Sequence, residues 1–428
     1  MFRVAVRELE SWLLADTEAL AGFLGIRKIL IPAGPDQLDD PKQVLVSLAA
    51  KARRADIRRD LVPRPASGPL NRSGLHVADA RIRAGSLETC GRRKQLGQLA
   101  QMPPAFARIG PEAVMTALLA DPLYKRHIPG PGHPERPARI DAVLSALDHA
   151  GLAAQMLRIP PRTASEDEVA ACHTRKYIEV VKHDVARGYE ALSTGDTPLG
   201  AESLDIALQA AGGVLNAVDA VVERRAQNAF CVVRPPGHHA TSDRGMGFCI
   251  FNNVAIAARY AQRRHGIERV LIADWDVHHG NGTQDIFYAD GSVFFFSTHQ
   301  HPWYPGTGRP DETGAGVGRG ATLNCPFPAG AGRAEILGAF QDRLLPAARD
   351  FQPDLVLISA GFDSRLGDPL GRFTLSDADF ADLTALMLEI ADTYAGGRLV
   401  SVLEGGYSLE GLASAAVAHV NALRGADL

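Results

Sequence analysis

Residues 269–284 read Arg-Val-Leu-Ile-Ala-Asp-Trp-Asp-Val-His-His-Gly-Asn-Gly-Thr-Gln, and this stretch decides the fold. Its first part, Val270 to Ala273, is short, apolar and β-branched, which predicts a buried strand. Side chains alternate along a strand, so we expect Asp274, Asp276 and His278 on one side, where they could hold a cation. The alternative is a polar strand end that faces water, but such a turn rarely needs so many titratable groups on one side.

The composition is that of an ordinary globular protein. The chain has 428 residues, of which 46% are hydrophobic and 22% charged, and its formal net charge is -4. This length suffices for one large domain or for two to three ordinary ones. The charge balance offers no basic footprint for nucleic acid and no polybasic patch for a membrane, so we expect neither partner. The sequence makes no prediction of the oligomeric state.

Cysteine usage and the N-terminal residues favour a cytoplasmic location. The cysteines are odd in number, widely spaced and free of any C-x-x-C pair, which argues against a disulfide framework and a thiolate zinc site. Charge interrupts the apolar run from Met1 to Glu8, so we expect no signal peptide. We also expect no stretch long enough to span a membrane. The five cysteines are Cys90, Cys172, Cys231, Cys249 and Cys325.

The N-terminal quarter of the chain differs from the rest. Residues 1–62 predict a small helical region, and residues 63–114, rich in Pro, Gly, Ser and Arg, predict a poorly ordered linker. Glu8 to Asp16 and Leu38 to Lys42 resemble, modestly, the tail of a family of small bacterial proteins of unknown function. Because Met115 looks like a natural protein start, our hypothesis is that residues 1–114 are a fused or wrongly assigned extension.

From residue 115 onward, strand and helix patterns alternate. Short apolar runs separated by amphipathic segments predict a parallel α/β sheet with helices on both faces. This pattern continues to the end of the chain at residue 428. The predicted strands are 229–233, 269–273, 292–297, 354–359 and 398–403, and the predicted helices are 137–150, 203–224, 253–265, 333–350 and 376–394.

Polar residues follow every predicted strand. In a parallel sheet the loops after the strands lie at one edge, where ligands bind, so residues far apart in sequence can meet there. Asp276, His278 and Asp363 would then supply two carboxylates and one imidazole, and three protein ligands leave positions open for water and substrate, as in a catalytic metal site. Two carboxylates cancel the charge of a divalent ion, so a neighbouring base is needed as well.

His238 and His239 are the candidate bases. Both follow a stiff Pro-Pro-Gly turn, and Asp274 could orient one of the imidazoles and raise its basicity. A lone histidine is more often structural, but a pair beside a carboxylate cluster favours a functional role. Tyr407 follows two glycines and could donate a hydrogen bond to a developing oxyanion, although a simple turn tyrosine is the default interpretation.

Aromatic residues near these loops predict a substrate slot. Phe248 and Tyr304 could line it, and plain core packing explains the same residues equally well. Cys231 and Cys249 are expected to pack as small hydrophobic residues rather than to react.

Seven segments carry a specific resemblance that spans about residues 115–428. They are 132–137, 234–240, 247–253, 274–284, 305–308, 359–371 and 404–407. Together they closely resemble the zinc-dependent histone deacetylase family, which includes bacterial amidohydrolases and acetylpolyamine amidohydrolases. The resemblance implies the arginase/deacetylase α/β fold.

The resemblance also implies roles for individual residues. Asp276, His278 and Asp363 match the zinc ligands, and His239 matches the general base and acid. His238 with Asp274 matches an electrostatic pair, and Tyr407 matches the donor that polarises the amide carbonyl. Phe248 and Tyr304 match the tunnel walls, and Gly247 lies at the tunnel rim. The resemblance also implies a potassium ion, bound by Asp274, Asp276, His278, Ser297 and Thr298.

Two positions depart from the most frequent family pattern. The residue expected to support His239 is Asn281, as in the class II-like branch, whereas other members carry Asp. This difference tunes basicity without forbidding catalysis. Tyr304 stands at a wall position where phenylalanine is common, which bears on the polarity of the tunnel and on the preferred acyl group.

The sequence therefore predicts a zinc amidohydrolase that removes an acyl group from an amine. The substrate is either acetyl-lysine in protein or an acetylpolyamine or another small acylated amine, and iron could replace zinc. One rival is a catalytically silent module that binds acyl-amines or scaffolds partners, which predicts a broken ligand or tyrosine position. Another is a two-metal manganese hydrolase of the arginase type, which requires more carboxylate ligands.

Overall fold

The structure is a computed structural model that describes residue 48 and residues 115–425. Residues 115–425 belong to the unit Pro111–Leu428, one of two into which the chain divides. The predictions for residues 1–62 and for the linker 63–114 lie outside the described residues, apart from Leu48.

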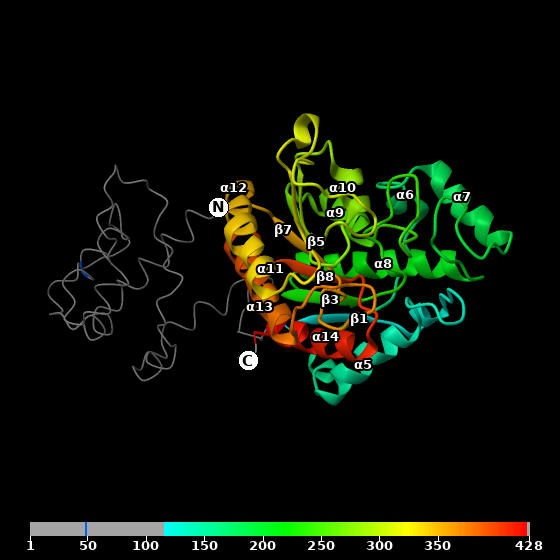
Figure 1. The fold of residues 1–428 in the computed structure, drawn as a ribbon, viewed down its shortest axis with the longest axis horizontal. Helices are drawn as coiled ribbons and strands as arrows, with labels where there is room; N and C mark the ends of the chain where they lie inside the picture. The colour runs from blue at the N-terminus through cyan, green and yellow to red at the C-terminus, as the bar shows by residue number, and fades with distance from the viewer. Residues whose placement is uncertain (1–47, 49–114, 426–428) are drawn as a thin grey trace, which may run out of the picture. The chain divides into compact units, whose positions relative to one another are not determined.

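Eight parallel strands form one sheet at the centre of this unit (Figure 1). Their order across the sheet is β2-β1-β3-β8-β7-β4-β5-β6. The strands are β1 (Ala117–Ala120), β2 (Leu157–Ile159), β3 (Asn228–Val232), β4 (Val270–Asp274), β5 (Val293–Gln300), β6 (Thr322–Phe327), β7 (Leu355–Ala360) and β8 (Leu399–Leu403).

The five predicted strands correspond to β3, β4, β5, β7 and β8. They form the centre of the sheet, are buried along their full length and so read as continuous apolar runs. The prediction missed three outer strands. β1 and β2 have only four and three residues, and β6 contains Pro326, which a strand tolerates only at an edge or a bulge.

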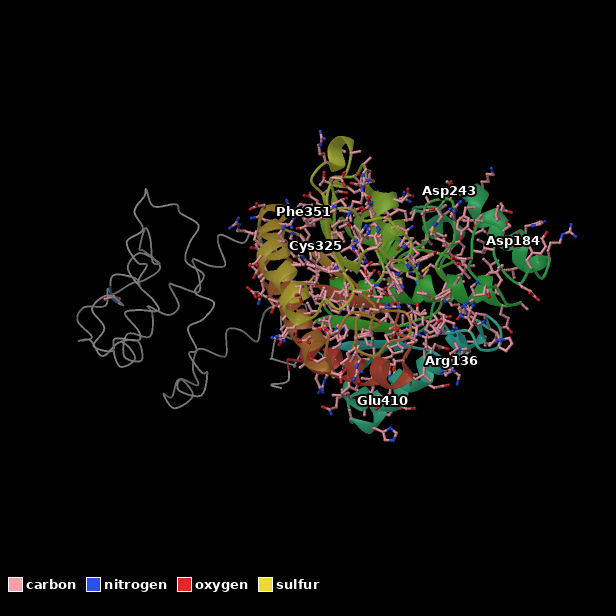
Figure 2. The ribbon with its side chains drawn as sticks, viewed as in Figure 1. Arg136, Asp184, Asp243, Cys325, Phe351 and Glu410 are labelled. Atoms are coloured by element: carbon pink, nitrogen blue, oxygen red, sulfur yellow. The ribbon has the colours of Figure 1, made fainter. Side chains whose placement is uncertain are left out.

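Helices cover both faces of the sheet. α5, α13 and α14 pack together on one face, and α8 and α9 pack together on the other (Figure 1). Side chains fill the space between these layers (Figure 2). The α-helices are α5 (Ala138–His149), α6 (Glu166–Val169), α7 (Arg175–Ala186), α8 (Ser203–Val222), α9 (Asn253–His265), α10 (Asn281–Phe287), α11 (Arg333–Ala339), α12 (Leu345–Phe351), α13 (Asp377–Tyr394) and α14 (Leu409–Leu423).

The helix predictions need two corrections. The helix expected over 333–350 is α11 and α12 joined by a π-helical turn at Phe340–Leu344. Pro346 follows that turn and has no backbone N–H to donate, so a regular α-helix cannot continue through it. The prediction also missed α6, α7, α10 and α14. The many alanines and the glycine of α14 give it a weak apolar periodicity.

Helix α8 corrects the expectation that no stretch reaches membrane-spanning length. The helix has 20 residues, and an 18-residue window within it has a mean hydropathy of 1.3, so it is long and apolar enough to cross a bilayer. However, 67% of that window is buried inside the protein, and α8 packs against α9 and the strands β1, β3 and β8. Within the described residues, α8 is therefore placed as a core helix.

The end of β4 shows how the sheet directs side chains to the site. Trp275 is fully buried in the core, where its ring packs against Phe340, Phe380 and His419. Its neighbours Asp274 and Asp276 are also fully buried but make polar contacts instead. The side chains therefore alternate as the sequence predicts: Trp275 packs in the apolar core, and Asp274 and Asp276 join a polar cluster.

Candidate active site

Backbone hydrogen bonds fix the loop that follows β4. Asp274 Oδ1 accepts a hydrogen bond from the Asp276 N–H (3.1 Å), and Asp276 Oδ1 accepts one from the His278 N–H (2.9 Å). Each carboxylate thus holds the backbone two residues ahead, in the manner of an Asx turn. These hydrogen bonds restrict both the backbone of the loop and the carboxylates of Asp274 and Asp276.

Asp276, His278 and Asp363 meet at one point. His278 Nδ1 lies 3.0 Å from Asp276 Oδ1 and 3.1 Å from Asp363 Oδ2. One donor atom from each residue lies within 4.8 Å of the others, as a shared metal ion requires. Asp363 follows β7, the neighbour of β4 in the sheet. The structure therefore brings the three predicted ligands together, although Asp363 is distant from the others in sequence.

Backbone donors and glycines shape this cluster. The N–H of Val277 donates to Asp363 Oδ1 (2.9 Å), and the N–H of Gly405 donates to Asp276 Oδ2 (2.8 Å). A Cβ atom at Gly405 would overlap both carboxylates, and one at Gly361 would overlap that of Asp276. The cluster is therefore a close-fitting cradle of oxygen and nitrogen donors, which is the size and chemistry that a small divalent cation requires.

The electrostatics of the cluster also favour a cation. Burial and the neighbouring Asp276 carboxylate raise the pKa of Asp363 to about 7. Burial opposes ionisation of Asp276 too, but the cationic forms of His238 and His278 outweigh it and lower the pKa of that carboxyl. Two carboxylates buried this close repel each other, and a divalent ion between them removes the repulsion.

Each histidine of the pair has its own partner. His238 Nδ1 lies 2.9 Å from Asp274 Oδ2, and His239 Nδ1 lies 2.7 Å from Asn281 Oδ1. The Asn281 side-chain N–H₂ faces the His239 carbonyl oxygen at 3.4 Å, which fixes the orientation of the amide. Asn281 Oδ1 can only accept, so His239 Nδ1 must carry the proton, and its Nε2 is left as a proton acceptor.

Their surroundings shift the pKa values of the two imidazoles in opposite directions. Burial lowers the pKa of His239 well below its usual value, and the adjacent His238 and His278 lower it further. Burial acts in the same direction on His238, but the carboxylates of Asp276 and Asp274 outweigh it and raise the pKa of His238 well above its usual value. Environments that separate the pKa values of two neighbouring groups are typical of acid–base sites.

Glu404 belongs to this site although sequence reasoning gave it no role. Its Oε2 accepts hydrogen bonds from the N–H groups of Gly237 (2.6 Å) and His238 (3.2 Å), and its Oε1 accepts one from the Ser359 hydroxyl (3.2 Å). Glu404 immediately follows β8. A polar residue directly after a buried strand was the signal that identified the other site residues, and Glu404 shows it too. His238, Cys249 and Glu404 form a second group of potential metal donors, but internal hydrogen bonds already engage both Glu404 oxygens.

Tyr407 lies at the edge of the cluster in a fixed loop. Asp368 Oδ2 accepts hydrogen bonds from the N–H groups of Tyr407 (2.6 Å) and Ser408 (3.0 Å). Burial, reinforced by the Asp363 carboxylate, raises the pKa of the phenol well above its usual value, so the phenol keeps its proton. Tyr407 can therefore act as a hydrogen-bond donor.

Phe248 and Tyr304 pack against residues of the polar cluster and its surroundings. The ring of Phe248 packs edge-on against Tyr407, with centroids 5.9 Å apart. The ring of Tyr304 packs in the same way against His239 (5.1 Å) and His278 (6.2 Å). A Cβ at Gly247 would strike the His239 ring. All three residues predicted at the slot therefore lie beside the cluster, and Phe248 adopts an uncommon positive φ of 68°.

Two of the predicted potassium residues, Ser297 and Thr298, lie on β5, the strand that pairs with β4. Ser297 is the register partner of Asp274 between β4 and β5. The Ser297 hydroxyl lies 2.9 Å from His299 Nδ1, whereas the buried Thr298 hydroxyl has no hydrogen-bond partner among the residues that the structure describes.

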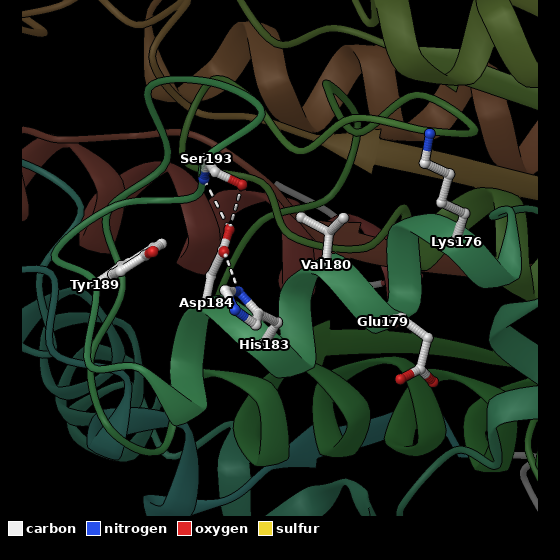
Figure 3. A pocket seen from close by; sticks show the side chains of 7 residues that line it. All are labelled: Lys176, Glu179, Val180, His183, Asp184, Tyr189 and Ser193. Carbon is white, nitrogen blue, oxygen red and sulfur yellow. Dashed lines mark hydrogen bonds and ion pairs between the residues drawn. The ribbon is translucent and has the colours of Figure 1, made fainter.

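A surface pocket on α7 is unrelated to the predicted site (Figure 3). At its lip, Asp184 accepts hydrogen bonds from the Ser193 N–H (2.8 Å) and hydroxyl (2.7 Å). None of the predicted site residues lines this pocket. Its lining residues are Lys176, Glu179, Val180, His183, Asp184, Tyr189 and Ser193.

Comparison with known families agrees with this geometry. The model of the histone deacetylase domain matches residues 133–423. The chain belongs to the histone deacetylase family. This finding confirms the family predicted from the sequence, and the matched range contains every residue of the predicted site.

Individual members of the family are similar over about two thirds of the chain. A probable deacetylase of Archaeoglobus fulgidus is 39% identical, over 70% of this chain and 83% of that protein. A histone deacetylase-like amidohydrolase of Pseudomonas aeruginosa is 42% identical, over 65% of this chain and 73% of that protein. Human polyamine deacetylase HDAC10 is 42% identical, over 68% of this chain and 44% of that protein.

A solved structure supports the predicted fold as well. The HD domain of HDA15 superposes with a TM-score of 0.69 at 38% identity, covering 73% of this chain and 90% of that one. The predicted arginase/deacetylase-type α/β fold is therefore confirmed.

Proposed function

We propose that this protein is a zinc-dependent amidohydrolase that removes an acyl group from an amine. The observation that carries the proposal is the buried set Asp276, His278 and Asp363, flanked by a neutral imidazole and a protonated phenol. Relatives named as deacetylases and as an amidohydrolase support the same class of reaction.

Asp276, His278 and Asp363 would hold the metal. Carboxylate and imidazole donors suit zinc, and iron accepts the same donors. When bound, a zinc ion supplies Lewis acidity, which polarises a carbonyl and makes water more acidic. The glycine cradle around the carboxylates supports a small ion rather than a bulky group.

His239 acts as the general base. Asn281 holds the Nδ1 proton, so the free Nε2 can take a proton from the attacking water. Water oxygen then bonds to the acyl carbon, and the carbon–nitrogen bond breaks. The proton passes to the leaving nitrogen, so the products are a carboxylic acid and a free amine. His238, kept cationic by Asp276 and Asp274, stabilises negative charge nearby.

Tyr407 stabilises the oxyanion. Its phenol stays protonated and can donate a hydrogen bond to the carbonyl oxygen as negative charge develops there. The loop fixed by Asp368 holds the phenol in place before the substrate binds, so no reorganisation is needed during the reaction.

The flanking aromatic rings favour a linear substrate. Phe248 and Tyr304 provide apolar faces beside the catalytic groups, and an unbranched alkyl chain is a shape that packs well along such rings. An acetylated lysine side chain and an acetylated polyamine both have this shape. The Tyr304 hydroxyl adds a polar atom at the wall, 3.5 Å from Asp196.

We also propose a potassium ion beside the metal, held by Asp274, Asp276, His278, Ser297 and Thr298. The buried Thr298 hydroxyl, which has no hydrogen-bond partner among the described residues, supports it, because such a group needs a ligand. A cytoplasmic location is part of the proposal as well. The four cysteines within the described residues are free thiols, as a reducing compartment favours.

The proposal is tested with metal-reconstituted enzyme and a panel of acetyl-lysine peptides and acetylpolyamines. Tyr407→Phe should lower kcat by about a hundredfold while the zinc content stays unchanged, because the phenol is not a ligand. Tyr189→Phe, at an exposed tyrosine outside the site, is the matched control. Equal losses of zinc and activity in Tyr407→Phe would contradict the role given to the phenol.

A further inference from the structure

Glu135 is a buried charge that the proposed mechanism does not use. It lies just before α5 and contacts two arginines, Arg139 and Arg234, and all three side chains are fully buried. Glu135 Oε1 lies 3.1 Å from Arg139 Nη1, and Glu135 Oε2 lies 2.6 Å from Arg234 Nη2. Burying three charges is costly unless each is fully hydrogen-bonded, so the other contacts of the two arginines are informative.

Arg139 connects Glu135 to the loop of Tyr407, the proposed hydrogen-bond donor to the oxyanion. Its Nε donates to the carbonyl oxygen of Gly406 (2.7 Å), and its Nη2 donates to that of Glu404 (2.5 Å). The guanidinium carbon also lies 5.1 Å from the centre of the Tyr407 ring. One planar group thus holds two carbonyls of the loop and contacts the ring itself.

Arg234 leads from Glu135 to the loop of the two histidines. It lies two residues after the end of the strand β3 and four residues before His238. Its Nη1 donates to the carbonyl oxygen of Tyr124 (2.9 Å), and its Nη2 donates to that of His127 (3.2 Å). The base of the histidine loop and the tyrosine loop therefore share one anchoring carboxylate.

The segment that carries Glu135 also supports the slot wall. His133 packs edge-on against Phe248, with ring centroids 4.6 Å apart. Its Nδ1 accepts a hydrogen bond from the Glu135 N–H (3.1 Å). The residues around Glu135 thus contact the wall, the phenol and the histidine loop.

We infer that Glu135 is a positioning residue for the deacylation reaction, acting through Arg139 on Tyr407. This inference rests on the proposed function. Glu135 itself does not contact the cluster of Asp276, His278 and Asp363. Its carboxylate fixes the orientation of the Arg139 guanidinium, and the guanidinium fixes the two carbonyls next to Tyr407. Without the carboxylate, the phenol is no longer held where the oxyanion develops, and kcat falls while substrate binding changes little.

A double-mutant cycle tests this inference. Glu135→Gln preserves the size of the side chain and removes its charge, and it should lower kcat about tenfold with KM and zinc content nearly unchanged. In a Tyr407→Phe background the same change should lower kcat less than about threefold, because the group that it positions is already gone. Equal fold losses in both backgrounds would overturn the inference, since a purely structural role is independent of the phenol.

Matched variants separate this effect from instability. Glu135→Gln leaves two buried guanidinium groups without their counter-charge and is expected to melt at a lower temperature, so assays are run well below that temperature. If it does not fold, Arg139→Lys keeps the charge but loses the planar set of donors, and the same two-background comparison is made with it. Glu179→Gln, at an exposed carboxylate that pairs with Lys182 (2.8 Å), is the control and should leave kcat unchanged.

A readout without turnover distinguishes failure of the inference from failure of the proposed function. Incorporation of 3-fluorotyrosine gives a ¹⁹F resonance for Tyr407, assigned by its loss in Tyr407→Phe. In Glu135→Gln that resonance should shift or broaden while the resonance of the exposed Tyr189 stays in place. An unchanged Tyr407 resonance would refute the positioning role. An inactive wild-type enzyme with a shifted resonance would instead refute only the proposed reaction.

Discussion

The Nδ1 atom of His239 lies 2.7 Å from Oδ1 of Asn281, and the amide of Asn281 is oriented by its second contact, to the His239 carbonyl oxygen. This pair decides which ring nitrogen of His239 can accept a proton. The histidine loop follows β3 and Asn281 begins α10, so the relationship depends on the whole sheet edge and not on one loop.

Asn281→Ala removes the partner that holds the Nδ1 proton. We expect kcat to fall by about ten- to a hundredfold, because the imidazole can then adopt the wrong tautomer or rotate. The zinc content should be unchanged, since Asn281 is not among the proposed ligands. Steady-state kinetics with metal analysis of the same samples checks this. Retention of full kcat would show that His239 needs no orienting partner.

Asp363→Asn should weaken metal binding directly. The amide cannot supply the second negative charge, so we expect zinc affinity to fall by at least about tenfold and activity to fall with it. Competition with a chelator measures the affinity. Asp377→Asn, which breaks a peripheral pair with Arg365, is the control. A variant that keeps both its zinc affinity and its activity would remove Asp363 from the metal site.

Gly405→Ala tests the close fit of the cradle. The added Cβ would overlap the carboxylates of Asp276 and Asp363, so we expect a loss of zinc with a lower melting temperature. Gly338→Ala is matched to it, because a Cβ at Gly338 meets nothing closer than 4.0 Å and lies on the helix α11. If both variants bind zinc like the wild type, the site is roomier than the structure indicates.

The pKa of Glu135 predicts how stability depends on pH. Burial opposes its ionisation, but Arg234 and Arg139 outweigh burial and lower its pKa from 4.5 to about 2. A lowered carboxyl pKa stabilises the folded state above the unfolded value of 4.5, and this stabilisation is lost as pH falls from 4.5 toward 2. Denaturant unfolding between pH 6 and about 3 should show a shallower decline in Glu135→Gln than in the wild type. Parallel declines would mean that Glu135 is not ionised in the folded protein.

Residues 115–428 should carry the activity without the N-terminal extension. All of the site residues and all eight strands of the sheet lie in this range. We therefore propose that the fragment binds zinc and deacylates substrate at the rate of the full chain. Kinetics and thermal melting of the two proteins are compared side by side. Loss of both activity and folding in the fragment would refute the view that residues 1–114 are a separate extension.

The strand ends explain why much of the site was predictable. Asp276, His278 and Asp363 each follow a strongly apolar strand, and parallel pairing of β4 with β7 places them together. The same rule placed one histidine of the pair beside Asp274, and the family resemblance identified it as His238. The sequence did not predict the outer strands β1, β2 and β6, because they are too short or too polar to show a clear hydrophobic pattern.

The anchoring network was not predictable in the same way. Glu135 and Arg234 are 99 residues apart, and neither lies in an element whose periodicity marks it as buried. A buried ion pair resembles two surface charges when only the sequence is considered, because burial of charge depends on the partner that the fold supplies. The π-helical turn at Phe340–Leu344 likewise depends on local backbone geometry that periodicity does not reveal.

The central claim is most directly tested by measuring carboxylic acid release from acetyl-lysine peptides and acetylpolyamines by the purified chain before and after zinc is removed and restored. The account predicts release with about one zinc per chain bound, loss of release on chelation, recovery on adding zinc, and neither binding nor recovery in Asp363→Asn. Intact substrates throughout the panel despite one bound zinc per chain would contradict it.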